Sequence, residues 1–307
     1  MAILYSGLET GNHRIAAGLD QGLLTSLTDM AWLGSPELGA IVDGGLVNGT
    51  GSDTGRIRLA GLGGADHFAS VAEGSESTDT AVGMAIADIA VARGALARNL
   101  GDIAQGTGTS GDLDPEKLAA DMVAGYRGYY NSLVCTAIAG ASTDVGTSGV
   151  DASVDDFYDG VYTLEIGGVT GPYFWLGHGR QFADFQESLR AEGGAAQFAP
   201  ATLEMLKIAG QGIAGEFMGV VFVKSSDVTS SGGNRHGAMF GYGAIGMKRM
   251  VPTPAIGAGT SLAVRMDELI VEITRDASKG QTEIAGNAYV GVGIIEDARI
   301  VGFVTDA

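Results

Sequence analysis

The first 80 residues of this chain hold too few large apolar side chains to form a hydrophobic core of their own. Residues 1–48 set one short amphipathic stretch, Ile15–Leu33, among glycine, serine and aspartate. Residues 49–80 are richer still in Gly, Ser, Thr and Asp, and the run Arg56–Leu59 lies between two polar stretches. Because burial of apolar surface must offset the entropy lost on folding, this part of the chain has to find its burial on other surfaces.

These residues form two limbs in our interpretation, and not a domain. Residues 1–48 are predicted to be an arm. Residues 49–80 are predicted to be a long projecting hairpin, because two stretches able to pair as strands flank a polar tip. A mostly structureless segment of that length would be unusual inside a compact domain. We therefore expect both limbs to contact a neighbouring molecule.

The rest of the chain can build a substantial core, since 45% of the 307 residues are hydrophobic. Small and apolar residues alternate over Val82–Ile86, which predicts a strand, whereas the apolar spacing over Leu96–Ile103 predicts a helix. The clearest element comes next. Asp114 suits a helix N-cap, Pro115 the first helical position and Gly140 the C-terminal cap, so we expect one long helix between them.

From Ser153 onward the pattern is mixed α/β and then β, which makes the whole chain α+β. Its 51 glycines indicate many turns, bulges and close backbone approaches. The predicted helices cover Ser153–Leu164, Gln181–Glu192 and Ala201–Ala209. The predicted strands cover Tyr173–Leu176, Met218–Val223, Glu268–Arg275, Ala288–Ile295 and Ile300–Val304, with a strand or turn structure at Gly237–Gly246.

No group of residues has the spacing of a known catalytic motif. Gly106–Gly111 matches the G-x-G-x-x-G pattern of dinucleotide-binding loops, but it follows a helix-like segment and acidic residues come directly after it, so a flexible linker is favoured. Asp155 and Asp156 could pair for acid–base chemistry, yet carboxylates at a helix start are more often caps. The single cysteine, Cys135, lies mid-helix among apolar residues and is expected to be a buried, inert thiol.

Cofactors and metals are not expected either. The four histidines are scattered and lack the paired spacing of metal-binding motifs; they are His13, His67, His178 and His236. We therefore predict no catalytic residues, no cofactor-binding residues and no metal ligands, and we expect the chain not to be an enzyme.

The charge of the chain restricts its partners. A formal net charge of −18 argues against general affinity for nucleic acid, because phosphate binding depends on clustered Lys and Arg. No lysine occurs before Lys117. The N-terminus has no pattern typical of a secretion signal, and no apolar run is long enough to span a bilayer, so synthesis in the cytoplasm without membrane contact is expected.

In order, the arm, the polar hairpin, the Asp114–Pro115 helix, the α/β middle and the β ending resemble the major capsid proteins of tailed bacteriophages, which have the Hong Kong 97-like fold. The resemblance spans nearly the whole chain. It also includes a local sequence similarity over Val271–Asp276 followed by Ile284–Gly291. No single motif within it is highly specific.

The resemblance implies a division of the chain into named parts. These are an N-terminal arm at 1–48, an E-loop at 49–80, a peripheral domain at 81–152 and 251–307 that includes a spine helix at 115–139, and an axial domain at 153–250. The arm and E-loop of such proteins overlap adjacent subunits. The residues expected to make assembly contacts are Arg14, Arg56, Arg58, Asp66, Glu73 and Glu76.

The resemblance also implies partners and a location. We expect hexamers and pentamers of this chain in a closed shell around double-stranded DNA, bound without sequence specificity, in a virion whose capsid is assembled in the host cytoplasm. A portal, a decoration protein and a separate scaffolding protein are the expected companions. One branch of the family crosslinks its shell through an E-loop lysine. Because no lysine precedes Lys117, this shell should be held non-covalently.

Three alternatives remain open at this point. An encapsulin-type nanocompartment would have the same fold but a protein cargo. A dinucleotide-dependent enzyme built on Gly106–Gly111 would be a monomer or small oligomer with bound cofactor. An acidic, secreted, β-rich adhesin would require an export signal, which we do not find.

Overall fold

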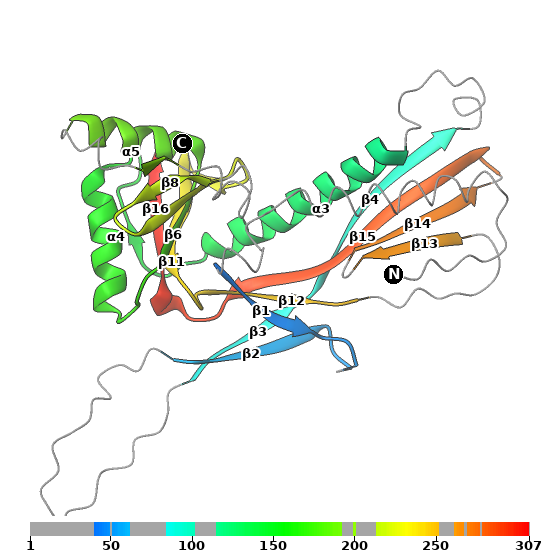
Figure 1. Cartoon of the computed structure of the whole chain (residues 1–307), viewed down its shortest axis with the longest axis horizontal. Coiled ribbons are helices and arrows are strands. Elements are labelled where there is room, and N and C mark those ends of the chain that lie inside the picture. The colour runs from blue at the N-terminus through cyan, green and yellow to red at the C-terminus, as the bar shows by residue number, and fades with distance from the viewer. Residues whose placement is uncertain are drawn as a thin grey trace, which may run out of the picture.

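The computed structural model describes residues 40–49, 51–61, 84–101, 115–191, 199–200, 213–251, 261–266, 269–276 and 278–306. The chain is α+β, as predicted. The described residues form two large sheets joined near the middle of an elongated molecule, together with a separate two-stranded sheet, and a long helix runs from one unit to the other (Figure 1). The predicted amphipathic stretch Ile15–Leu33 and the predicted helix Ala201–Ala209 lie outside the described residues.

The first sheet has the order β1-β12-β15-β14-β13, and β4 also pairs with β15. The β1–β12 pair is parallel and the others are antiparallel. Its strands are β1 (Ile41–Leu46), β4 (Ala92–Gly101), β12 (Ile245–Arg249), β13 (Ser261–Met266), β14 (Leu269–Asp276) and β15 (Gln281–Ile294).

Helix α3 (Pro115–Ile138) packs on this sheet and begins and ends where its capping signals predict. Its 24 residues correspond to about 36 Å. The buried side of the helix is apolar and joins the largest core cluster of the protein. The residues of α3 in that cluster are Met122, Val123, Tyr126, Tyr130, Val134, Cys135 and Ile138.

The predicted helix over Leu96–Ile103 is wrong: the described part of this segment belongs to strand β4. This strand pairs with β15 over ten consecutive positions, from Ala92 opposite Val290 to Gly101 opposite Gln281. Long-range backbone hydrogen bonds and packing of Leu96 against α3 outweigh the weak local preference that the apolar spacing indicates. Ile103 itself lies outside the described residues.

The second sheet has the order β5-β16-β11-β6-β9-β8-β7, with β10 paired to β11. Helices α4 (Val154–Ile166) and α5 (Gly179–Ala191) accompany it in the unit drawn on the left of Figure 1. Its strands are β5 (Asp144–Val145), β6 (Tyr173–Gly177), β7 (Ala199–Pro200), β8 (Ile213–Phe217), β9 (Val220–Lys224), β10 (Ser230–Ser231), β11 (Asn234–Gly241) and β16 (Ile300–Asp306).

The two faces of this second sheet belong to different cores. Aromatic side chains of α4 and α5 pack with Trp175 and Phe222, whose ring centroids lie 5.1 Å apart. On the other face, Phe174 and Phe240 belong to the cluster that contains α3. The sheet is thus held from both sides, and α3 ties it to the first sheet.

The capping of α4 follows the sequence prediction. Ser153 accepts a hydrogen bond from the backbone N–H of Asp156, and the Asp156 carboxylate accepts one from the backbone N–H of Ser153, which completes a capping box. Asp156 therefore acts as a cap, the alternative that the sequence favoured over acid–base chemistry.

The sheets divide the chain differently from the predicted boundaries at 153–250 and 251–307. Strand β16 pairs with β11 and so lies in the α/β unit, although it was grouped with the other terminal strands. Strand β12 lies in the first sheet, although it falls within 153–250. Among the described elements, the chain therefore crosses between the sheets three times: through α3 from β4 to β5, at the β11–β12 turn, and through the short helix η3 (Asp297–Arg299) between β15 and β16.

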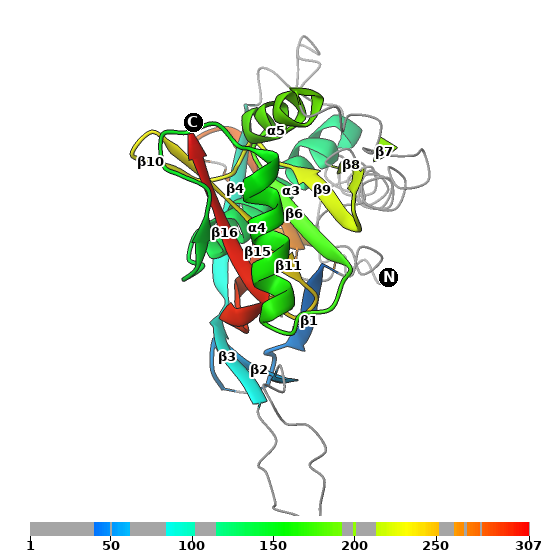
Figure 2. The same cartoon turned by 90° about the vertical axis from the view of Figure 1, so that its left-hand side faces the viewer.

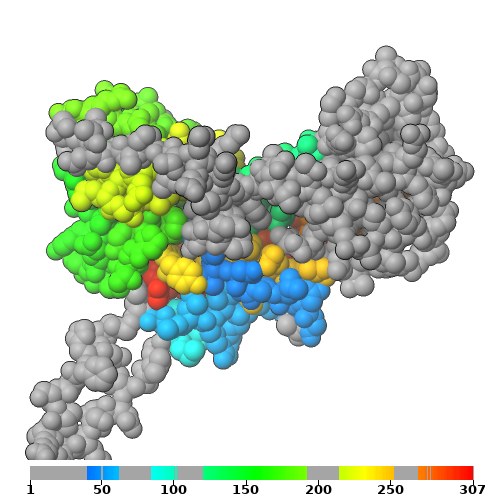
Figure 3. All heavy atoms as spheres, in the orientation of Figure 1, coloured from blue at the N-terminus to red at the C-terminus, as the bar shows by residue number. Residues whose placement is uncertain are grey.

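A separate two-stranded hairpin, β2 (Thr54–Ala60) and β3 (Met84–Ala90), lies below the junction of the two sheets (Figures 1 and 2). The described part of the predicted strand at Val82–Ile86 belongs to β3, which extends to Ala90, and Val82 itself lies outside the described residues. The tip of the predicted hairpin lies outside the described residues. In the space-filling view, the blue atoms of β1 and β2 spread across the lower middle of the molecule (Figure 3).

Candidate functional site

The outer face of the β2–β3 hairpin is exposed and combines charged with apolar side chains. Arg56 lies opposite Asp88, and its guanidinium makes two hydrogen bonds to that carboxylate, 2.7 Å from Nε to Oδ1 and 2.8 Å from Nη2 to Oδ2. The next pair on this face joins Arg58 to Ile86, which is 51% exposed. Met84, at the end of β3, is 56% exposed. A monomer therefore presents two large apolar side chains to water beside two arginines.

The ion pair on this face is well defined but contributes little to stability. The hydrogen bond from Arg56 lowers the pKa of Asp88, and the same bond raises the pKa of Arg56. Both side chains are about half exposed, where solvent screens such pairs. Its effect is to order the two side chains into one flat, bidentate unit that another surface can contact.

The inner face of the hairpin anchors it to the body. Ile57, Ala85 and Ile89 are buried and form a small cluster with Ile295, the residue that follows β15. The alternation of buried and exposed side chains along both strands is what a hairpin with one covered face requires. This cluster keeps the exposed face directed away from the molecule.

Lys248, on β12, packs against the base of the same hairpin. Its side chain is 8% exposed, and its Nζ donates a hydrogen bond to the carbonyl oxygen of Gly44. A Cβ atom at Gly55 would lie 2.8 Å from the Lys248 side chain, and one at Gly44 would lie 2.5 Å from Ile57. Glycine at both positions leaves room for the lysine to pass between β1 and β2.

The predicted contact residues are only partly placed by the structure. Arg56 and Arg58 lie together on the exposed face of β2, two residues apart on the same side of the strand. Arg14, Asp66, Glu73 and Glu76 lie outside the described residues, as does the Gly106–Gly111 segment. The role of all six contact residues stays a prediction.

A second exposed surface, on α4, was not found from the sequence. Tyr158, Tyr162 and Ile166 are 43%, 63% and 69% exposed and follow one another at steps of four along the helix. Figure 2 shows α4 facing outward on its side of the molecule. The signal was available, because the helix also carries a buried apolar side at Phe157 and Leu164 and is therefore apolar on two sides.

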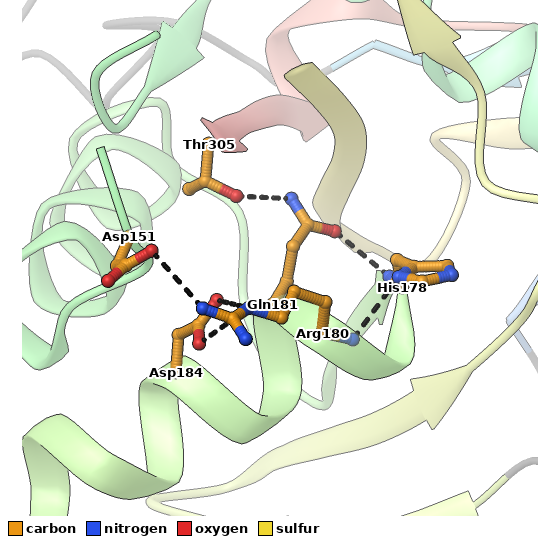
Figure 4. Close-up of polar contacts among 6 residues, drawn as sticks. All are labelled: Asp151, His178, Arg180, Gln181, Asp184 and Thr305. Carbon is orange, nitrogen blue, oxygen red and sulfur yellow. Dashed lines mark hydrogen bonds and ion pairs between the residues drawn. The ribbon is translucent and has the colours of Figure 1, made fainter. Parts of the chain in front are cut away.

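Polar residues around α5 form the cluster drawn in Figure 4. The side-chain amide of Gln181, which is fully buried, accepts a hydrogen bond from the backbone N–H of His178 and donates to the Phe303 carbonyl and the Thr305 hydroxyl. Arg180 contacts Asp184 at 3.1 Å and Asp151 at 3.8 Å. The cluster ties the C-terminal strand β16 to α5, which is a structural role.

Burial shifts the pKa values of two groups in the α/β unit and of one on α3. Burial raises the pKa of Asp184 and lowers that of His178, and it raises the pKa of Cys135 to about 11, as expected for an inert thiol. Within the described residues, no three His, Cys, Asp or Glu side chains come together in a way that could hold a metal ion. None of the described helices is long and apolar enough to cross a membrane.

Comparison of the fold with solved structures identifies it. Over 99% of this chain and 91% of the other, the chain matches the mature capsid of bacteriophage PhiM1 with a TM-score of 0.56 and 11% identity. The chain has the Hong Kong 97-like capsid fold. The structure of Mycobacterium phage Che8 matches with a TM-score of 0.55 and 13% identity, over 82% of this chain and 84% of the other.

The same capsid fold also occurs in a holo-SrpI encapsulin complex from Synechococcus elongatus. That structure matches with a TM-score of 0.58 and 12% identity, over 100% of this chain and 92% of the other. No family model matches the sequence, and the curated proteins include no significant relative. At these identities the likeness establishes the capsid fold, which sequence relatives alone would not have identified.

Proposed function

We propose that this protein is the major capsid protein of a tailed phage, and that many copies assemble into a closed icosahedral shell around double-stranded DNA. The observation that carries the proposal is the capsid fold over nearly the whole chain. It is supported by the β2–β3 hairpin, whose outer face carries exposed Met84 and Ile86. A role in forming the shell, and not catalysis, accounts for both.

The named parts of the fold follow from this proposal. The E-loop at 49–80 and the part of the arm at 1–48 that precedes β1 extend to neighbouring subunits, whereas β1 itself pairs with β12 in the first sheet. The hairpin β2–β3 is the base of the E-loop. The peripheral domain comprises the first sheet with α3 as its spine helix, and the axial domain comprises the second sheet with α4 and α5. We group β12 with the peripheral domain because it pairs with β15, and β16 with the axial domain because it pairs with β11.

Each subunit of a closed shell needs at least two different contact surfaces, because a head-to-tail contact joins unlike patches. We assign the outer face of β2–β3 and the exposed side of α4 to contacts between copies of this chain. The two surfaces are complementary in charge: Arg58 lies on the hairpin, whereas Asp155 and Asp159 lie beside the exposed tyrosines of α4. Many such weak contacts make a strong shell.

Further partners belong to the same proposal. A separate scaffolding protein, a portal and a decoration protein are the expected companions, and the shell is placed in the virion after assembly in the host cytoplasm. The contacts are non-covalent, since the first lysine of the chain is Lys117 on α3. No cofactor is required.

Electron microscopy of the purified chain tests the proposal directly. Closed particles are expected, and nucleic acid inside particles isolated from the native source would support a phage capsid. Closed particles holding only protein cargo would replace this assignment by an encapsulin-type compartment. A protein that stays monomeric under all assembly conditions, including addition of its scaffolding protein, would contradict both.

A hairpin variant sharpens this test. Replacing residues 62–82 by a short Gly-Ser linker keeps β2, β3 and their buried contacts, so the subunit should fold as judged by circular dichroism. It should fail to form particles, because the reach of the E-loop is lost. A second variant replaces residues 62–82 by a Gly-Ser segment of the same length. It shows whether assembly needs only the length of the E-loop or also the side chains that contact the neighbouring subunit. Normal particles from the shortened variant would exclude the E-loop from assembly.

A further inference from the structure

The place where the hairpin leaves the body is held by one arginine. Arg299 is the last residue of η3, the short helix between β15 and β16. Its Nη2 donates a hydrogen bond of 2.9 Å to the carbonyl oxygen of Ala60, the last residue of β2. Its Nη1 donates one of 3.1 Å to the carbonyl oxygen of Tyr242, in the turn between β11 and β12. A single guanidinium therefore joins three segments that are far apart in the sequence.

The guanidinium is itself held in place. Its Nε makes an ion pair with the Glu296 carboxylate, and both side chains are about 15% exposed. Gly243, with φ at +87°, lets the β11–β12 turn approach closely, because a Cβ there would lie 3.3 Å from Nη1 and 3.2 Å from Leu59. Contacts within the body therefore orient the Arg299 guanidinium independently of its hydrogen bond to the hairpin.

The three segments have different mechanical roles. Ala60 is the described end of β2, whereas the Tyr242 turn and η3 are two of the three described connections by which the chain crosses between the sheets, the third being α3. A rotation of one sheet against the other would move these two connections relative to β2. The bonds to Ala60 and Tyr242 could then not both keep their length.

The remaining contact between the hairpin and the body is largely apolar, through Ile57, Ala85, Ile89 and Ile295. Apolar contacts are not directional, so they resist separation of two surfaces more than they resist sliding or tilting. Hydrogen bonds from a charged donor are both stronger and directional. The contact of Arg299 with Ala60 therefore adds a directional restraint on the hairpin that the apolar cluster alone does not supply.

We propose that Arg299 is a positioning residue that sets the angle of the β2–β3 hairpin and couples this angle to the relative orientation of the two sheets. The functional meaning rests on the proposed shell function: the hairpin angle determines where the E-loop meets the next subunit, and the sheet orientation determines the curvature of the shell. The geometric part concerns the single subunit and stands apart from assembly.

Spin labels on the isolated subunit test the geometric part. Labels at Met84→Cys and Asp159→Cys, both on exposed positions, report the distance between the hairpin and α4 by pulsed electron paramagnetic resonance. Dilution with unlabelled protein removes distances between subunits. The parent should give one narrow distribution, and Arg299→Gln should at least double its width. Arg299→Lys keeps the charge but loses the planar fork, so it should give an intermediate width.

Arg56→Gln is the matched control, because it removes an arginine pair on the same hairpin without touching the body. The distribution of distances between the two spin labels in this variant should equal that of the parent. Equal distributions for the parent and both Arg299 variants would overturn the proposal, and if Arg299→Gln does not fold, Arg299→Lys alone decides.

The assembly part is read separately, by microscopy of particles from Arg299→Lys. Particles of altered size or irregular shape are expected when the hairpin angle is loosened. Particles identical to those of the parent, formed by a subunit whose distribution has broadened, would exclude the link to shell geometry. Absence of particles from the parent chain would instead count against the proposed function and leave the spin-label result valid.

Discussion

Individual buried polar residues decide how firmly the C-terminal strand is attached. Gln181 is fully buried, and its amide bridges the start of α5 to β16 through Phe303 and Thr305. A buried amide is stabilising only when its donors and acceptors are paired. Because these partners lie more than 120 residues away in the sequence, the Gln181 amide is paired with them only when β16 is in place.

Gln181→Leu should destabilise the subunit by about 2 kcal/mol, because buried backbone and hydroxyl groups lose their partner. Urea denaturation followed by tryptophan fluorescence measures the change, since Trp175 lies in the adjacent core. Gln186→Leu on the same helix is the control, because its side chain is only partly buried. Equal stability of the two variants would show that the buried amide is not needed.

Asp184 should make stability depend on pH. Burial raises its pKa, with a smaller opposing effect from Arg180. A raised pKa means that the folded state binds the proton more tightly than the unfolded chain, so the folded state gains stability as the pH falls through the folded pKa towards the lower pKa of the unfolded chain. The ionised carboxylate carries its burial penalty at neutral pH, where asparagine would carry none.

Relative to the parent, the free energy of unfolding of Asp184→Asn should therefore be higher at about pH 7 than at about pH 4. Urea denaturation at each pH measures this difference. Glu187→Gln, an exposed change on the same helix, should show a smaller pH dependence. A difference between the Asn variant and the parent that is the same at both pH values would contradict the assignment to Asp184.

At the scale of elements, the close approach of β15 to the hairpin depends on a glycine. A Cβ at Gly291 would lie 2.1 Å from the carbonyl oxygen of Ala90, the last residue of β3. This is the point at which the chain passes from the hairpin to β4. The obstructed atom belongs to the backbone, which cannot move aside as a flexible side chain can.

Gly291→Ala should displace β3 and destabilise the subunit by about 2 kcal/mol, a typical cost of overpacking. Gly293→Ala is a close control on the same strand, because its Cβ would meet only Ile89 at the ordinary distance of 3.4 Å. Thermal unfolding of both variants measures the difference. If Gly293→Ala proved as harmful as Gly291→Ala, the backbone contact would not be the cause.

The molecule as a whole carries a formal net charge of −18, and this bears on what a shell could contain. A wall that repels phosphate leaves packaged duplex free to slide and to leave later. If the chain forms the proposed shell around DNA, its negative charge limits adhesion between the shell and the duplex.

The purified subunit should accordingly show no tight binding to duplex DNA at ~150 mM salt, where Debye screening leaves only close contacts. Fluorescence anisotropy of a labelled duplex provides the measurement, with a basic DNA-binding protein as positive control. Submicromolar binding by the acidic subunit would refute the idea of a repelling wall.

Part of this fold is readable in the sequence because its signals act over a few residues. The ends of α3 follow from Pro115 and the glycine at 140, and the start of α4 follows from the Ser153 capping box. Apolar runs predicted β6, β14 and β16 to within a few residues. The polar, glycine-rich composition of residues 49–80 predicted a hairpin, and the described part of it supplies β2.

Tertiary structure alone decided which strands share a sheet and which surfaces stay exposed. The spacing around Leu96 predicted a helix, yet β4 is a strand because it pairs with β15 over ten consecutive positions. Strands β12 and β16 each lie in the other sheet from the one that the predicted boundaries imply. Arg299 donates a hydrogen bond to Ala60, which is 239 positions away in the sequence. Helix caps and the periodicity of apolar residues depend on residues that are close in the sequence. Strand pairing, and contacts such as that between Arg299 and Ala60, form only once distant segments have come together.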